Sequence, residues 1–128
     1  MTRVTSPPSV RLLLRASAGG VRWSVVAANG RVLGASLGLL PDSRAAQSDF
    51  FALCPMLPDL PVTFGREVRA REWTWRIGDS ETGHVAVSGQ GYERHATARA
   101  AFGRFVTAAT ELCAAASRPT EPARPGQR

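Results

Sequence analysis

The chain has 128 residues, of which 44% are hydrophobic and 20% are charged. This composition excludes a wholly disordered, collagen-like or fibrous chain, and the length suits one ordinary domain or two small repeats. The formal net charge is +6, and every basic residue is an arginine. Half of the excess lies outside residues 9–117, which contain 12 arginines and 9 acidic residues, so the fold itself is expected to be only mildly basic.

Three strands are predicted in the first half of the chain. Apolar and polar residues alternate over 10–15 and again over 21–25, which is typical of strands with one buried face. Asn29 and Gly30 form a strong short-range signal for a hairpin turn. Residues 31–36 are therefore expected to return as the third strand.

A helix is expected to follow over 43–53. Asp42 can accept hydrogen bonds from the free amides at its start, and apolar residues recur within it at helical spacing. Pro55 is expected to end the helix. Residues 55–63 carry a proline at every third position, which predicts an extended, polyproline-like connector.

The second half of the chain repeats this order of elements. Residues 64–71 predict a weak, charged strand at the edge of a sheet, and residues 73–77 predict the next strand. A turn and a return strand are expected over 79–88, followed by a helix over 94–116. Gly103 lies inside this helix, where glycine costs about 1 kcal/mol relative to alanine. It therefore predicts a close contact with the other half of the molecule.

The two halves align when the sequence is shifted against itself by 52 positions. The aligned pairs include Trp23 with Trp75, Ser36 with Ser88, and Phe50 with Phe102. We therefore predict an α+β fold of two tandem βββα repeats, each a three-stranded antiparallel sheet covered on one face by a helix. A pseudo-twofold axis is expected to relate the repeats, which could pack helix to helix or join their sheets.

The boundaries follow from composition and from the aligned pattern. The first repeat is expected to span 9–54 and the second 64–117, with the connector at 55–63 between them. Residues 1–8 are expected to be a disordered N-terminus. Residues 118–128, rich in proline and arginine, are expected to be a disordered tail.

These segments carry a family resemblance. The residues concerned are the tryptophan strands 22–25 and 73–77, the Asn29–Gly30 turn and the Ser-Gly-Gln-Gly-Tyr link at 88–92. Together they resemble the repeat of the YegP-like family of small bacterial and archaeal proteins of unknown function, which often contain tandem repeats. The second half departs from the pattern because it lacks the Asn-Gly turn. The resemblance implies a fold and supplies no catalytic residues.

Four arginines form the main candidate site. Arg11, Arg15, Arg22 and Arg76 are predicted to point to the sheet face away from the helices. Such a face could bind nucleic-acid phosphates or an acidic protein surface. The alternatives are a merely solvated polar face, which is usual for antiparallel sheets, and a face that pairs with a second chain.

The remaining candidates are each expected to have a structural role. The three tryptophans could stack on bases, but their phase with apolar neighbours favours the core. His84 and His95 lack a partner nucleophile or carboxylate at a recognisable spacing. The Gly89-Gln90-Gly91 link could hold an anion but is predicted to be a turn. Asp79 and Glu81 are a turn pair with too few oxygen ligands for calcium.

Cys54 and Cys113 show no metal-ligand spacing and are predicted to be two buried free thiols in a reducing cytoplasm. No signal-peptide core or membrane segment is recognisable in the sequence, which agrees with a cytoplasmic location and no membrane partner. No metal site and no cofactor are predicted.

Three functions remain open at this point. The first is a non-catalytic binding or interaction module, the second a nucleic-acid-binding protein that uses the arginine face, and the third an enzyme of unknown reaction. The chain is expected to be a monomer with an internal pseudo-dimer or a homodimer.

Overall fold

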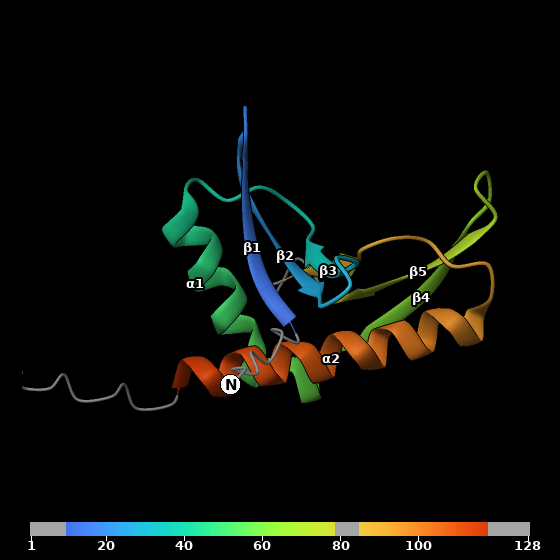
Figure 1. Cartoon of the computed structure of the whole chain (residues 1–128). Coiled ribbons are helices and arrows are strands. Elements are labelled where there is room, and N and C mark those ends of the chain that lie inside the picture. The colour runs from blue at the N-terminus through green and yellow to red at the C-terminus, as the bar shows by residue number, and fades with distance from the viewer. Residues whose placement is uncertain (1–9, 79–84, 118–128) are drawn as a thin grey trace, which may run out of the picture.

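The computed structural model describes residues 10–78 and 85–117. Six strands and two α-helices make up this part of the chain, with a 3₁₀ helix, η1, after the first α-helix (Figure 1). Their order is β1 (Val10–Ser17), β2 (Gly20–Ala27), β3 (Val32–Ser36), α1 (Ser43–Leu53), η1 (Cys54–Asp59), β4 (Val62–Glu67), β5 (Glu72–Ile77), β6 (Ala86–Ser88) and α2 (His95–Ser117).

All six strands belong to one antiparallel sheet with the order β1-β2-β3-β6-β5-β4. The predicted α+β class is therefore confirmed. The two halves meet at the centre of this sheet, where β3 pairs with β6. Of the two packing alternatives, joined sheets is the one observed. The predicted edge strand is confirmed in its position, because β4 lies at one edge and β1 at the other, but β4 ends at Glu67 and residues 68–71 form the turn to β5.

Local chemistry explains the first turn and the first helix. In the Asn29–Gly30 turn, the Ala27 amide donates to Arg31 O at 2.8 Å, and Gly30 has a φ of 88°, which favours glycine. Asp42 caps α1, since its Oδ1 accepts a hydrogen bond from the Ala45 amide at 2.8 Å. Both predictions are confirmed.

The connector is helical, so the prediction of an extended, polyproline-like segment is wrong. Cys54–Asp59 forms η1, with Pro55 in its first turn and Pro58 inside it. Polyproline II and the 3₁₀ helix both have three residues per turn, so prolines at every third position align on one face of either. Burial of Leu57 in the core accompanies the compact form.

The core lies between one face of the sheet and the two helices. α1 packs on β1 and β2, while α2 runs across both halves of the sheet and contacts β1, β2, β3, β4 and β5 (Figure 1). Trp23 and Trp75 project from this face and are 0% and 1% exposed. Phe105 of α2 packs against both rings, with centroids 6.4 and 4.9 Å away. One helix residue thus connects the two halves of the core.

Gly34 is needed where β3 passes under α2. A Cβ at this position would lie 2.5 Å from Phe105 and 2.8 Å from Trp75, and both of these rings are fully buried. The absence of a side chain lets the aromatic rings approach the centre of the sheet closely.

Several contacts recur in the two halves at the same sequence separation. The Trp23 amide donates to Ser36 Oγ at 3.3 Å, and the Trp75 amide donates to Ser88 Oγ at the same distance. Isolated bridges join Val21 to Leu40 and Trp73 to Tyr92. The hydrogen bond and the bridge of the second half each follow their counterparts in the first half by 52 positions. The start of α2 likewise follows the start of α1 by 52 positions.

Gly103 makes no close contact, so the prediction based on it is wrong. A Cβ at this position would meet nothing within 4 Å. The glycine is exposed on α2 and lines an open hollow together with Val10 and Leu33 of the first half.

Replacing this glycine is therefore expected to stabilise the fold. Gly103→Ala should raise the free energy of unfolding by about 1 kcal/mol, because alanine loses less backbone entropy in a helix interior. Urea denaturation followed by circular dichroism measures the change. A loss of stability would show that the site is more crowded than the structure indicates.

Several predictions fall outside the described residues. They are the turn over 79–83 with Asp79 and Glu81, the start of the return strand at His84, the N-terminus at 1–8 and the tail at 118–128.

Candidate functional site

Arg11, Arg15, Arg22 and Arg76 lie in the strands and are all exposed. They alternate with side chains that enter the core, such as Leu12, Trp23 and Trp75. Because successive side chains of a strand point to opposite faces, the four arginines lie on the face that α1 and α2 leave open. We call this surface the open sheet face.

A row of paired residues crosses all six strands on the open sheet face. In strand order it consists of Leu13, Ser24, Ala35, Val87, Arg76 and Thr63, each paired with the next. Arg76 belongs to this row, while Arg11, Arg15 and Arg22 flank it on β1 and β2. The strand pairing therefore brings residues far apart in sequence onto one surface.

Arg15 and Arg22 are the closest of these arginines. They are directly opposite each other in the β1–β2 register. Like charges in this position repel and destabilise a hairpin. The Arg22 Nε donates to the main-chain oxygen of Ser36 at 2.7 Å, which holds that guanidinium over β3. Neither arginine forms an ion pair with an acidic residue of the described chain.

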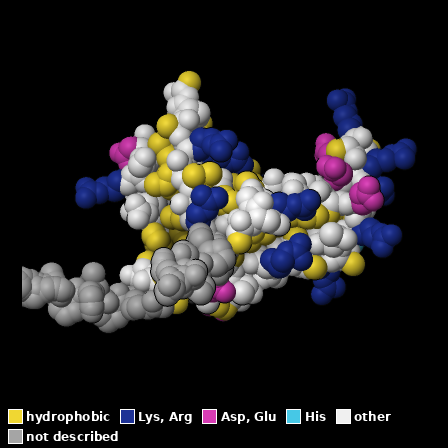
Figure 2. Space-filling view, in the orientation of Figure 1, with side chains coloured by type: hydrophobic (Ala, Val, Ile, Leu, Met, Phe, Trp, Pro, Cys, Tyr) yellow, Lys and Arg dark blue, Asp and Glu magenta, His cyan; other side chains and the backbone are white. Residues whose placement is uncertain are grey.

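Acidic residues are sparse on this face. Within the six described strands only Glu67 and Glu72 are acidic, and they pair with each other at the far end of the β4–β5 hairpin. Figure 2 shows acidic and arginine side chains together at that tip. All the charged residues of the β1–β2 part of the open sheet face are therefore arginines.

The tryptophans do not lie on the open sheet face. Trp23 and Trp75 are core residues, as predicted, and Trp73 is half-buried. The His95 ring packs edge-on against Trp73 and Phe64, with centroids 4.8 and 5.2 Å away. No aromatic stacking platform is therefore available on the described part of the open sheet face.

The polar candidates that the structure describes form no catalytic cluster. His95 is exposed at the start of α2, where its ring contacts Phe64 and Trp73. Among residues 10–78 and 85–117, no group of His, Cys, Asp and Glu side chains is arranged to hold a metal ion. Gly89 and Gly91 lie in the link to α2, where the Gly89 amide donates to Leu33 O at 3.4 Å.

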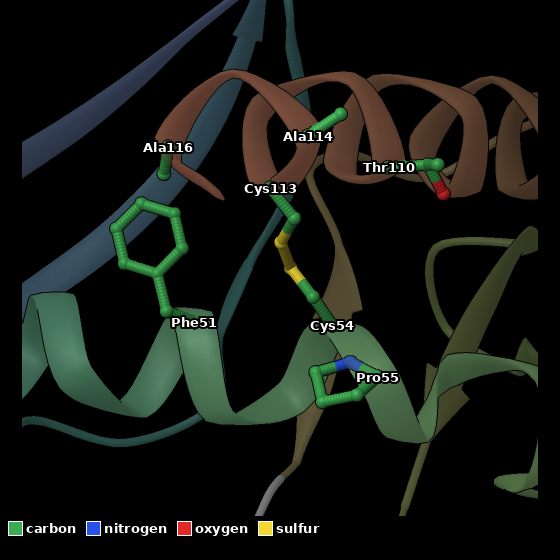
Figure 3. Close-up of a pocket in the computed structure, with 7 residues that line it drawn as sticks. All are labelled: Phe51, Cys54, Pro55, Thr110, Cys113, Ala114 and Ala116. Carbon is green, nitrogen blue, oxygen red and sulfur yellow. A yellow bond between two sulfur atoms is a disulfide. The ribbon is translucent and has the colours of Figure 1, made fainter. Parts of the chain in front are cut away.

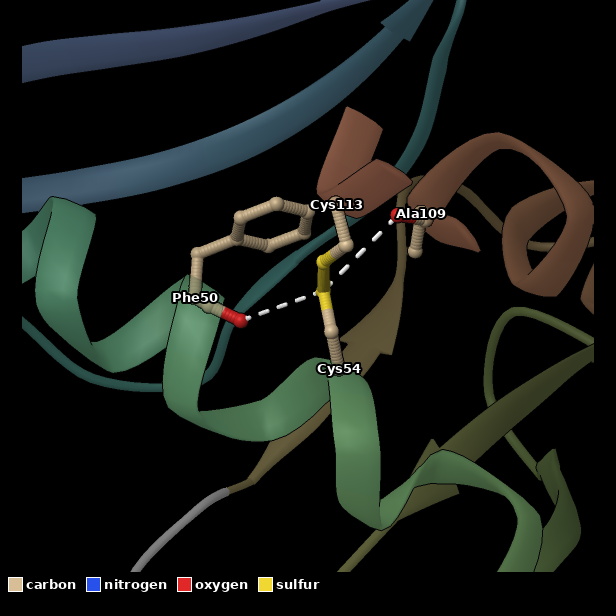
Figure 4. The surroundings of a disulfide bond; sticks show 4 residues. All are labelled: Phe50, Cys54, Ala109 and Cys113. Atoms are coloured by element: carbon tan, nitrogen blue, oxygen red, sulfur yellow. Dashed lines mark hydrogen bonds between the residues drawn. A yellow bond between two sulfur atoms is a disulfide. The ribbon is translucent and has the colours of Figure 1, made fainter. Parts of the chain in front are cut away.

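Cys54 and Cys113 form a disulfide, so the prediction of two free thiols is wrong. Their Cα atoms are 6.5 Å apart, and the bond ties the start of η1 to the C-terminal part of α2 (Figure 4). At a sequence separation of 59 there is no local signal for the bond, because the pairing depends on how α2 crosses the sheet. Disulfides are typical of oxidising compartments and are rare in the cytosol, so this bond gives no support to a reducing cytoplasm.

The sulfur of Cys54 also lies close to two main-chain oxygens. It is 3.5 Å from Phe50 O and 3.7 Å from Ala109 O (Figure 4). A disulfide sulfur carries no proton, so only the reduced thiol can donate hydrogen bonds to these oxygens. The site therefore has acceptors available to the thiol when the bond is broken.

A shallow hollow of about 550 Å³ lies beside the disulfide (Figure 3). Phe51 and Pro55 line it on one side, and Thr110 and Ala114 of α2 line it on the other. Among the described residues that line it, the hydroxyl of Thr110 is the only polar side-chain group, which offers little chemistry for recognising a polar ligand.

Sequence reasoning missed one polar cluster. Arg31, Tyr92 and Arg104 come from the β2–β3 turn, the link before α2 and α2 itself, yet they line a common pocket. No local motif joins three residues so far apart in the chain. Only the packing of α2 against the β2–β3 hairpin brings them together.

Neither α-helix in the described ranges is long and apolar enough to cross a membrane. Comparison of the chain with protein-family models, with curated proteins and with solved structures finds no match.

Proposed function

We propose that this chain is a non-catalytic interaction module that binds an acidic protein surface on its open sheet face. The observation that carries the proposal is the direct pairing of Arg15 with Arg22, with no acidic residue of the described strands nearby. Two positive charges at opposite positions of neighbouring strands repel each other in the free protein, and a carboxylate-bearing partner lowers that repulsion.

The mixture of side chains on this face favours a protein partner. Leu13 is 36% exposed and Val87 is half-buried, and both share the row that contains Arg76. Arginine beside apolar residues is typical of protein–protein interfaces, which are depleted in lysine and glutamate. Carboxylates also accept paired hydrogen bonds from the planar guanidinium fork.

Nucleic acid is the second candidate partner. The guanidiniums of Arg11, Arg15 and Arg76 have no ion-pair partner among the described residues, and they support it because phosphate contacts provide most nonspecific affinity for nucleic acids. The burial of Trp23 and Trp75 argues against single strands, which rely on exposed aromatic rings for stacking. A duplex, contacted through its phosphates, is the form of nucleic acid that this surface suits.

The same proposal includes two tandem βββα repeats of a YegP-like type. The matched Trp–Ser hydrogen bonds and the matched isolated bridges support the repeat. The β3–β6 pairing supports a pseudo-twofold axis, since Gly34 pairs with Ser88 as Ser36 pairs with Ala86 around the central pair Ala35–Val87. The likeness to the YegP-like family rests on the sequence motifs alone. Cytoplasmic location and the choice between monomer and homodimer also remain predictions.

Reversing one charge of the Arg15–Arg22 pair is expected to change stability and partner binding in opposite directions. Arg15→Glu should raise the free energy of unfolding by up to about 1 kcal/mol, because an opposite-charge pair replaces a repulsive one. The same change should abolish binding to an acidic partner. Arg99→Glu, on the exposed side of α2, changes the net charge equally and is the matched control.

Fluorescence anisotropy with labelled probes tests the proposed function. A poly-glutamate peptide, duplex DNA and duplex RNA are titrated with wild type, Arg15→Glu and Arg99→Glu at several salt concentrations. Peptide binding that only Arg15→Glu loses supports the protein-partner proposal. Duplex binding with a steep salt dependence and no peptide binding overturns it in favour of nucleic acid. Binding of no probe, or equal losses in both variants, contradicts both candidates.

A further inference from the structure

A pocket of about 270 Å³ lies between the β2–β3 turn, the link before α2 and α2. It is separate from the open sheet face, because α2 covers the other side of the sheet. Its polar lining is formed by Asn29, Arg31, Gln90, Tyr92 and Arg104, and Leu33 is part of its apolar lining. Polar groups that converge from several elements onto a small hollow are typical of ligand sites.

The main chain around this pocket is held in place by hydrogen bonds. The Arg31 amide donates to Asn29 Oδ1 at 2.9 Å, which fixes the turn that carries the arginine. Tyr92 exchanges two main-chain hydrogen bonds with Trp73, at 2.6 and 2.8 Å. Arg104 precedes Phe105, which is anchored in the core. The three side chains therefore start from rigid positions, which lowers the entropy cost of binding a ligand.

The pocket carries positive charge that the described protein does not neutralise. Arg31 and Arg104 form no ion pair with an acidic side chain of the described residues. Burial raises the pKa of the Tyr92 hydroxyl, while the nearby charges of Arg104 and then Arg31 act to lower it. Both guanidiniums are therefore close enough to act on the same phenol. Glu72, the acidic residue beside this link, lies against Gly91 and does not contribute to the shift.

The repeat architecture does not require these three residues. At the positions 52 residues away, Arg31 corresponds to Gly83, Tyr92 to Leu40 and Arg104 to Ala52. Leu40 lines a hollow in which no described lining residue is an arginine. The link and helix positions that carry Tyr92 and Arg104 thus have described counterparts in the first half, but those counterparts, Leu40 and Ala52, carry neither a phenol nor a charge. This asymmetry points to a role in binding rather than in folding.

We propose that Arg31, Tyr92 and Arg104 form a binding site for the phosphate group of a small phosphate monoester. Two guanidinium forks and a phenolic hydroxyl, coming from three segments, suit the several oxygens of a tetrahedral anion better than a planar carboxylate. The pocket is larger than a phosphate group, and Val32 and Leu33 offer apolar surface to the rest of the ester. The neutral Tyr92 hydroxyl donates to a phosphate oxygen.

Isothermal titration calorimetry with glycerol 3-phosphate, inorganic phosphate and acetate tests the site. Arg31→Gln and Arg104→Gln should each weaken binding of glycerol 3-phosphate by about tenfold or more. Tyr92→Phe should weaken it less, and Arg99→Gln, outside the pocket, should leave it unchanged. Tighter binding of the ester than of inorganic phosphate supports an ester ligand. Equal affinities, no heat with either phosphate probe, equal affinity for acetate, or an equal loss in Arg99→Gln would each overturn the proposal.

Tyr92 provides a second readout because it is the only tyrosine of the chain. Its ionisation can be followed by ultraviolet absorbance, and a bound phosphate should raise its apparent pKa by opposing the phenolate charge. Without ligand, Arg104→Gln and Arg31→Gln should also raise this pKa, while Arg99→Gln should not. If neither pocket variant moves the titration of Tyr92, the two guanidiniums are not positioned as the site requires.

Discussion

Reduction of the Cys54–Cys113 bond is expected to lower the free energy of unfolding by about 4 kcal/mol, the value that the chain-entropy relation gives for a loop of this length. The bond closes a sequence separation of 59 residues and joins the two halves of the molecule. Without it, the unfolded chain gains conformational freedom, whereas the folded chain keeps its sheet and core. Measured effects of such bonds are commonly about 2–4 kcal/mol.

Urea denaturation of the wild type with and without a reductant measures this effect. The double variant Cys54→Ser, Cys113→Ala serves as the control, since it cannot form the bond and should not respond to reductant. Its serine hydroxyl can donate its one hydrogen to Phe50 O or to Ala109 O, as the reduced thiol would. If the wild type is equally stable in both conditions, or if a thiol assay finds two free cysteines in the native protein without reductant, the bond does not contribute as described.

Trp23→Phe is expected to destabilise the fold by at least about 2 kcal/mol more than Trp75→Phe. The two rings are equally buried and both pack against Phe105. Their indole groups differ, however. Trp23 Nε1 donates to Asp49 Oδ2 at 2.8 Å, whereas Trp75 Nε1 is buried with no hydrogen-bond partner among the described residues. The first substitution loses a charge-assisted bond, and the second removes an unsatisfied donor.

The comparison uses each variant as the control for the other, because both replace indole by benzyl in the same core. The loss of ring volume is common to both and cancels in the difference. Equilibrium denaturation of the two variants gives the two stabilities directly. If the two variants lose equal stability, or if Trp75→Phe loses more, the Trp23–Asp49 hydrogen bond does not stabilise the fold as proposed.

Much of the fold could be predicted because short-range patterns determine it. Alternation placed the strands, Asn29–Gly30 placed a turn, and Asp42 placed the start of α1. The prediction of an extended connector was wrong because its proline spacing fits two kinds of helix with three residues per turn. The burial of Leu57 is a tertiary effect that cannot be read from the spacing. The prediction of a close contact at Gly103 was wrong because a glycine in a helix does not by itself show whether another element packs against it.

The candidate sites likewise include features that local sequence patterns predict and features that depend on tertiary packing. Strand phase alone placed Arg11, Arg15, Arg22 and Arg76 on exposed positions of their strands. It did not supply the direct pairing of Arg15 with Arg22, which depends on the β1–β2 register. The disulfide and the Arg31–Tyr92–Arg104 pocket depend on where α2 lies across the sheet. That placement is a long-range packing result with no local sequence signal.

Nuclear magnetic resonance mapping of a bound acidic peptide tests the proposed interaction module most directly. Amide chemical shifts of the full chain are followed while poly-glutamate is added at low salt, with the Arg15→Glu variant in parallel. The shifted amides are expected to cluster on β1 and β2 around Arg11, Leu13, Arg15 and Arg22, and the variant is expected to show no such cluster. Shifts confined to α2, or a pattern that Arg15→Glu leaves unchanged, would contradict the assignment of the open sheet face as the binding surface.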